Sequence, residues 1–160
     1  MRRICVETTI PSFYFEVRTE PTMVSRRLWT REWFDMSNQV DELVTSAAVI
    51  EELERGDFPG REDAIELVAA LSPLPITDQI QEIVREYINR LLMPADPSGD
   101  ALHLALASFY GCDFLATWNC KHLNANLSTR RIAHPNDPTR PLISHLQTVV
   151  LLERLDEVGS

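Results

Sequence analysis

The sequence predicts an α/β protein in which helices cover both faces of a central parallel sheet. Three short apolar segments have the length and composition of buried parallel strands: Arg3–Val6, Leu43–Ser46 and Phe114–Thr117. Amphipathic segments lie between them, and strands that alternate with helices favour parallel pairing. The chain has 160 residues, which is long enough for one domain with a sizeable core.

Two helices are expected between the first two strands. Pro11 permits a helix to start there, and a short aromatic turn follows it. A longer helix is expected from Thr22, and its apolar residues form a broad stripe that includes Trp29, Trp33 and Phe34. We interpret these aromatic residues as core or dimer contacts rather than as a base-stacking platform. Because they exceed what a small core needs, they favour a homodimer.

Further helices are expected between the second strand and the breaker at 93–99. Ser46 is placed to cap the first of these helices, which ends at Gly56, and a second helix follows a short turn. A short extended piece or edge strand is expected at 74–76, where prolines flank and interrupt the sequence. A third amphipathic helix then begins near Thr77.

The stretch at 98–122 joins a helix to a buried strand. The helix has an acid, Asp100, in its first turn, and Gly111 ends it. A buried strand follows at 114–117. Polar and aromatic residues come directly after this strand: Trp118, Asn119, Lys121 and His122. Open α/β sheets place their functional sites at the carboxyl ends of strands, so we expect a site here.

The C-terminal part of the sequence gives weaker patterns. A short polar turn or helix is expected at 123–127 and a strand at 131–133. The segment 136–141 contains asparagine, aspartate and two prolines, and is therefore predicted as a loop. A last strand is expected at 142–143 and a closing helix at 146–155.

The composition argues against a broad basic surface and against a membrane segment. The net charge is −9, and fourteen of the fifteen basic residues are arginine. An acidic protein still attracts phosphate locally if it binds metal ions beside a few basic groups. Three cysteines without paired spacing indicate reduced thiols in an intracellular protein. No long apolar run occurs, so we expect no membrane span and a cytoplasmic location.

This arrangement makes the carboxylates of Glu7, Glu52 and Asp100 a candidate site. Parallel strands bring Glu7, the helix that carries Glu52, and Asn119 to one edge of the sheet; Asp100 reaches that edge if the preceding loop folds over. Two unit charges roughly 4 Å apart repel by about 4 kcal/mol at an effective dielectric constant of about 20. Such a cluster either takes up protons or binds a hard divalent cation, and its oxygen ligands favour Mg²⁺ or Mn²⁺ over Zn²⁺. The alternative for Asp100 is an ordinary first-turn acid that stabilises its helix by about 0.3–1 kcal/mol.

Four motifs in this order resemble one family. They are the acid and two hydroxyl residues at Glu7-Thr8-Thr9, E-L-x-R-G at 52–56, D-A-L-H-L-A-L-A at 100–107 and T-W-N-x-K-H at 117–122. Together they are similar to PIN-domain nucleases, especially the VapC-type toxins of prokaryotic toxin–antitoxin pairs. The likeness covers nearly the whole chain, and it implies a single three-layer PIN-like domain over residues 1–160.

The resemblance also implies an activity and a set of site residues. PIN nucleases hydrolyse RNA phosphodiester bonds as Mg²⁺- or Mn²⁺-dependent endoribonucleases, and VapC-type toxins have a cognate antitoxin and commonly dimerise. Glu7, Glu52 and Asp100 match the acidic metal ligands, and Asn119 falls where many members have a fourth acid. Thr8 matches a hydroxyl that assists the site.

Lys121 and His122 are candidates for contacts with a substrate phosphate. Their alternative is a solvated turn in which His122 caps a carbonyl. His103 lies between leucines on a largely buried helix, so we interpret it as a hydrogen-bonded core histidine rather than a ligand.

Two departures from the family pattern motivate a second hypothesis. Glu7 stands where Asp is usual, which lengthens the ligand by one methylene, and Asn119 lacks the negative charge of Asp. The alternative function is therefore a catalytically weakened PIN-fold binding or regulatory module.

Overall fold

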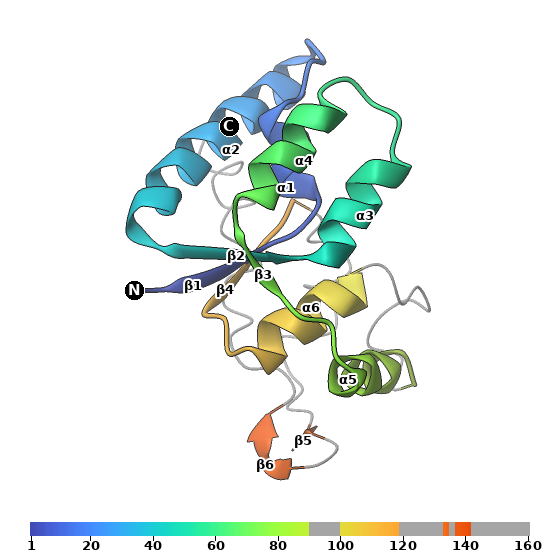
Figure 1. Ribbon diagram of the computed structural model, residues 1–160. Helices are drawn as coiled ribbons and strands as arrows, with labels where there is room; N and C mark the ends of the chain where they lie inside the picture. The colour runs from blue at the N-terminus through green and yellow to red at the C-terminus, as the bar shows by residue number, and fades with distance from the viewer. Residues whose placement is uncertain (90–99, 119–132, 135–136, 142–160) are drawn as a thin grey trace.

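A four-stranded parallel sheet lies at the centre of the computed structural model, which describes residues 1–89, 100–118, 133–134 and 137–141 (Figure 1). The strand order is β3-β2-β1-β4. The strands are β1 (Arg3–Val6), β2 (Glu42–Ser46), β3 (Ser72–Leu74) and β4 (Phe114–Ala116). All three strand pairings are parallel. The predicted α/β architecture is therefore confirmed.

Helices lie on both faces of this sheet, as Figure 1 shows. One face is covered by α1 (Thr9–Tyr14), α2 (Pro21–Val40) and α4 (Arg61–Ala69), with α3 (Ala47–Arg55) packed against α4. The other face is covered by α5 (Asp78–Asn89) and α6 (Asp100–Phe109), which pack against each other. The result is the three-layer arrangement that the sequence predicts.

The side chains of β1 alternate between the two cores. Ile4 and Val6 belong to the apolar cluster under α1 and α2, whereas Cys5 belongs to the cluster that contains α5 and α6 residues. Successive strand residues point to opposite faces, so a strand between two helical layers must be apolar throughout. This explains why the whole of β1 is buried except Arg3, which is half-buried.

Several predicted boundaries need correction. α1 begins at Thr9, two residues before the expected start at Pro11, and β3 occupies 72–74 rather than 74–76. Ser46 stands at the N-cap position of α3, but its hydroxyl makes no capping hydrogen bond. Gly111 ends α6 as predicted, since its φ of 62° is in the left-handed region that glycine adopts without strain.

A small antiparallel pair of strands follows, β5 (Ala133–His134) and β6 (Asp137–Pro141). The prediction of a loop at 136–141 is therefore wrong for the five residues of β6. Proline cannot donate a ladder hydrogen bond, but a two-stranded ribbon consists of edge strands, where proline is tolerated. The elements predicted at 123–127, 142–143 and 146–155 lie outside the described residues. Within the described residues, no helix has the length and hydropathy needed to cross a membrane.

Candidate acidic site

Glu7 is held at the carboxyl end of β1, between two neighbouring strands. β1 pairs with β2 on one side and β4 on the other. The Glu7 N–H donates to the carbonyl of Ala116, the last residue of β4, at 3.4 Å. Only 5% of the residue is exposed. A carboxyl group at this depth requires hydrogen-bond donors, because a buried ion without partners is strongly disfavoured.

Thr9 supplies these donors to Glu7. Its backbone N–H donates to Glu7 Oε1 at 2.8 Å, and its hydroxyl donates to the same oxygen. The Thr9 hydroxyl oxygen also accepts the backbone N–H of Trp118 at 2.8 Å. Thr9 therefore connects the acid at the end of β1 to the residues that follow β4.

Glu52 lies on α3, the helix that follows β2, and its side chain contacts Thr8 just after the end of β1. The Thr8 hydroxyl donates to Glu52 Oε2. The Nε2 atom of His103 lies 3.0 Å from Glu52 Oε1. Consecutive threonines thus bind the two acids, Thr8 binding Glu52 and Thr9 binding Glu7. The side chain of Glu52 remains 20% exposed, so it is accessible from solvent in a way that Glu7 is not.

The pKa values of the two acids shift in opposite directions. Burial raises the pKa of Glu7, although the charge of His103 and hydrogen bonds from Thr9 and Thr117 oppose this effect. Burial also acts to raise the pKa of Glu52, but the hydrogen bonds and charge of His103 and Thr8 outweigh it, and the net pKa of Glu52 is lowered. The shifts therefore favour the ionised form of Glu52 and the neutral form of Glu7.

Trp118 fixes the direction in which the chain leaves β4. Its indole Nε1–H donates to the hydroxyl of Thr30 on α2 at 2.8 Å. The Arg26 guanidinium lies 5.0 Å from the Trp118 ring centroid and 5.3 Å from that of Phe13. These contacts, within the distance expected of cation–π pairs, clamp the indole between α1 and α2. The Trp118 backbone N–H also donates to the Thr9 hydroxyl, which itself donates to Glu7, so Trp118 is connected to Glu7 through Thr9.

The other predicted site residues are described only in part. Asp100 is the first residue of α6, and its side chain lies outside the described part of the structure. Asn119, Lys121 and His122 also lie outside the described residues. Within the described ranges, no three His, Cys, Asp or Glu side chains are grouped closely enough to hold a metal ion. The prediction that Glu7, Glu52 and Asp100 converge on one cation therefore stays a prediction.

The donor chemistry of the described part suits a hard cation. Glu7 and Glu52 offer carboxylate oxygens, and neither thiol nor imidazole ligands accompany them in the manner of a zinc site. The Nε2 atom of His103 is engaged with Glu52 Oε1 at 3.0 Å, so it is not presented to a metal. The oxygen donors of Glu7 and Glu52 therefore fit a hard cation such as Mg²⁺ or Mn²⁺ better than Zn²⁺.

His103 is buried and hydrogen-bonded, as its position on the helix predicts. Its partner Glu52 does not follow from the sequence, because the two residues are 51 positions apart. One signal was available in the sequence. His103 is three residues after Asp100 in the same helix, so the two residues lie on the same side of it, and His103 could be expected near the predicted acidic site.

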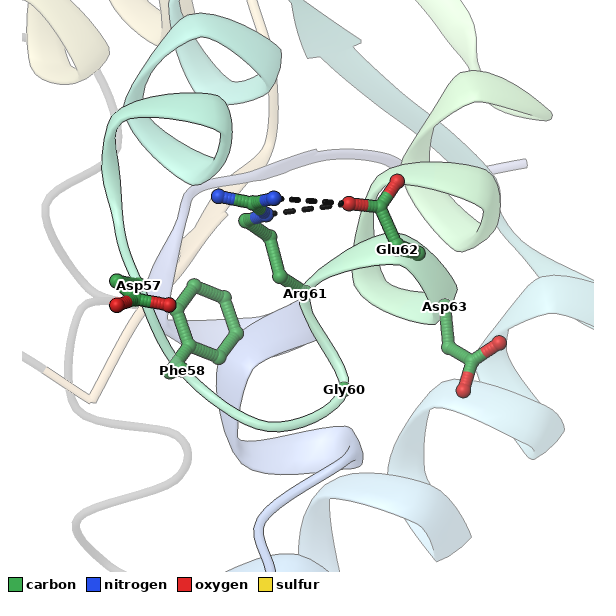
Figure 2. Close-up of a pocket in the computed structure, with 6 residues that line it drawn as sticks. All are labelled: Asp57, Phe58, Gly60, Arg61, Glu62 and Asp63. Atoms are coloured by element: carbon green, nitrogen blue, oxygen red, sulfur yellow. Dashed lines mark hydrogen bonds and ion pairs between the residues drawn. The ribbon is translucent and has the colours of Figure 1, made fainter.

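A pocket of about 350 Å³ lies elsewhere, at the turn between α3 and α4 (Figure 2). Asp57, Phe58, Gly60, Arg61, Glu62 and Asp63 line it. The Arg61 guanidinium is engaged by Glu62 at 3.1 Å and by the Gly56 carbonyl at 3.0 Å. The remaining acids, Asp57 and Asp63, disfavour a phosphate at this place. The pocket contains none of the predicted site residues.

A parallel sheet with one acid at the carboxyl end of β1 and a second on the helix that follows β2 defines an α/β protein with a candidate site at that edge. The family is identified by sequence: a model described as the PIN domain matches residues 4–119, and the chain therefore belongs to the PIN-domain family. PIN domains have a nuclease-type fold, bind nucleic acid and are usually metal-dependent ribonucleases. A search of curated proteins finds no match to this sequence.

Proposed function

We propose that this protein is a divalent-metal-dependent endoribonuclease that hydrolyses RNA phosphodiester bonds. The observation that carries the proposal is the pair of hydrogen-bonded acids at the end of β1 in a PIN fold. Adjacent threonines hold them, since Thr8 donates to Glu52 and Thr9 donates to Glu7, and the charge of His103 acts on both carboxyl groups. Carboxylates held from distant parts of the chain beside one strand end are what a site for a hard cation requires.

The proposed metal ligands are Glu7, Glu52 and Asp100, with Asn119 at the fourth position. A bound Mg²⁺ or Mn²⁺ would polarise the phosphate and lower the pKa of a water molecule. In the hydrolysis itself, the water oxygen bonds to phosphorus, the bond to the leaving oxygen breaks, and that oxygen gains a proton. Thr8, Lys121 and His122 are the proposed substrate contacts; the Thr8 hydroxyl hydrogen is already donated to Glu52, so Thr8 would meet substrate as an acceptor.

We further propose that the chain is the toxin of a toxin–antitoxin pair, acts in the cytoplasm and forms a homodimer. The aromatic residues that first suggested a dimer do not support it, because Trp33 and Phe34 are buried in the chain's own core and Trp29 packs against them. The support comes instead from other residues of α2. Leu28, Met36 and Val40 are 55%, 60% and 60% exposed.

A cleavage assay with matched variants tests the proposed activity. The purified chain is incubated with a mixture of structured and single-stranded RNAs and Mn²⁺ or Mg²⁺, with chelator as the control. We expect cleavage that requires the cation, and a loss of about 100-fold or more for Glu7→Gln and Glu52→Gln. Glu54→Gln, an exposed acid on α3, is the matched control and should retain activity.

The second hypothesis, a weakened binding or regulatory module, predicts a different result. Such a protein would bind RNA or the cation without cleaving RNA. Cation binding with no detectable hydrolysis in the same assay would overturn the ribonuclease proposal and favour this alternative. Co-purification of a small partner encoded beside the gene would test the toxin–antitoxin role separately.

A further inference from the structure

His103 contacts Glu52, and its charge also acts on Glu7. It is the fourth residue of α6 and lies one helical turn after Asp100. Only 2% of the residue is exposed, and its neighbours from Ala101 to Ser108 are all buried. A polar ring at this depth is accommodated only if it forms hydrogen bonds. Its position brings a third element, α6, to the acids from β1 and α3.

The geometry fixes both oxygens of Glu52. His103 Nε2 lies 3.0 Å from Oε1, and the Thr8 hydroxyl donates to Oε2. An ionised carboxylate only accepts hydrogen bonds, so the His103 ring must carry its proton on Nε2 to donate to Oε1. Each carboxylate oxygen still has a second lone pair for another partner. The two donors therefore fix the orientation of Glu52 without using up its capacity as a ligand.

This control of orientation matters for a glutamate. Glu52 has three rotatable side-chain bonds and is 20% exposed, so it would otherwise sample many orientations. Ordering such a side chain at the moment of binding lowers affinity, and donors that hold it beforehand avoid this loss. In many metal sites a carboxylate orients a ligating histidine. Here the roles are exchanged, because the histidine donates to the carboxylate.

We propose that His103 is a positioning residue of the acidic site, which holds Glu52 through the Nε2–H···Oε1 hydrogen bond in the orientation that binds a divalent cation. This inference rests on the proposed function, since it assumes that Glu52 is a metal ligand. The alternative is that His103 only stabilises the packing of α6 in the core. A packing role predicts that any substitution of similar stability has the same effect on cation binding.

The metal-free protein gives the first test. Long-range ¹H–¹⁵N spectra of the histidine rings report which nitrogen carries the proton. We expect His103 to be protonated on Nε2, with a slowly exchanging Nε2–H signal that shifts in Glu52→Gln. A His103 ring protonated only on Nδ1, or a signal that does not respond to Glu52→Gln, would overturn the inference without any metal present.

The second test compares Mn²⁺ dissociation constants by calorimetry for the wild type and four variants, of which Glu52→Gln marks the loss of the proposed ligand. His103→Gln keeps a donor close to the position of Nε2, whereas His103→Leu removes it. Leu106→Val perturbs the buried apolar face of the same helix and serves as the packing control. We expect His103→Leu to weaken Mn²⁺ binding about 10- to 100-fold, as is usual for the loss of a residue that orients a ligand. His103→Gln and Leu106→Val should stay close to the wild type.

The outcomes separate the two proposals. If the wild type binds Mn²⁺ and His103→Leu binds it equally well, the positioning role is wrong while the proposed nuclease stands. If the wild type binds no Mn²⁺, the proposed function is wrong, and the inference about His103, which depends on it, is wrong as well. Should His103→Leu not fold, as judged by circular dichroism, a His103→Gln variant that folds but loses Mn²⁺ affinity as much as Glu52→Gln would overturn the inference.

Discussion

Thr9 donates both its backbone N–H and its hydroxyl to a single atom, Oε1 of Glu7, and the N–H···O distance is 2.8 Å. The two residues lie on either side of the junction between β1 and α1. The same hydroxyl accepts the N–H of Trp118, so one threonine side chain links β1, α1 and the end of β4. This relationship makes the Thr9 hydroxyl a structural requirement of the site.

We predict that Thr9→Val lowers the free energy of unfolding by about 1–3 kcal/mol. Valine has the shape of threonine, but it leaves the Trp118 N–H without its acceptor and removes a donor from buried Glu7. Denaturant unfolding measures the effect. Thr9→Ser keeps the hydroxyl and is the control; equal losses for the valine and serine variants would show that the hydroxyl contributes nothing.

Glu7 should make the metal-free protein less stable as the pH rises. Burial raises its pKa above the ordinary value of 4.5, so the folded state holds the proton more tightly than the unfolded state. Its contribution to stability is then greatest below pH 4.5 and is lost as the pH rises through the folded-state pKa. In chelator, the melting temperature of wild type relative to Glu7→Gln should fall between pH 4.5 and neutral pH. A constant difference across this range would contradict the prediction.

Substitution of Asp100 should change the melting temperature in opposite directions with and without metal. Mn²⁺ at about 100 times its dissociation constant should stabilise the wild type by about 2.7 kcal/mol, because the unfolded chain lacks the site. Asp100→Asn should remove most of the rise in melting temperature and should increase the melting temperature without metal, since it relieves repulsion among the acids. A first-turn acid that serves only its helix would instead lose stability in both conditions.

The exposed apolar residues of α2 should form a contact between two copies of the chain. Leu28, Met36 and Val40 lie within about 120° of one another around the helix, at 100° per residue. Light scattering at concentrations of tens of micromolar should give the mass of a dimer, and Met36→Glu should reduce it to that of a monomer. Ile76→Glu, another exposed apolar position, is the control. A monomeric wild type would refute the prediction.

The sequence determined the architecture because short apolar strands, amphipathic helices and a helix-ending glycine are all recognisable from neighbouring residues. The short segment Arg3–Val6, apolar from Ile4 onwards, is β1 with unchanged bounds. Gly111 ends α6 as predicted, because glycine adopts a positive φ without strain. Alternation of such strands with amphipathic helices was sufficient to predict parallel pairing. Parallel pairing in turn places Glu7 at the carboxyl end of β1, beside the strand that leads to Asn119.

The tertiary structure decided which side chains meet. His103 and Glu52 are 51 positions apart, and Trp118 and Thr30 are 88 apart, so no local pattern connects them. It also decided that Trp33 and Phe34 are core residues, which their helical spacing left open. Periodicity identifies the face of a helix that is buried, but the partner of that face depends on how distant elements pack. Hydrogen bonds act over about 3 Å, and only the packed fold sets positions with that accuracy.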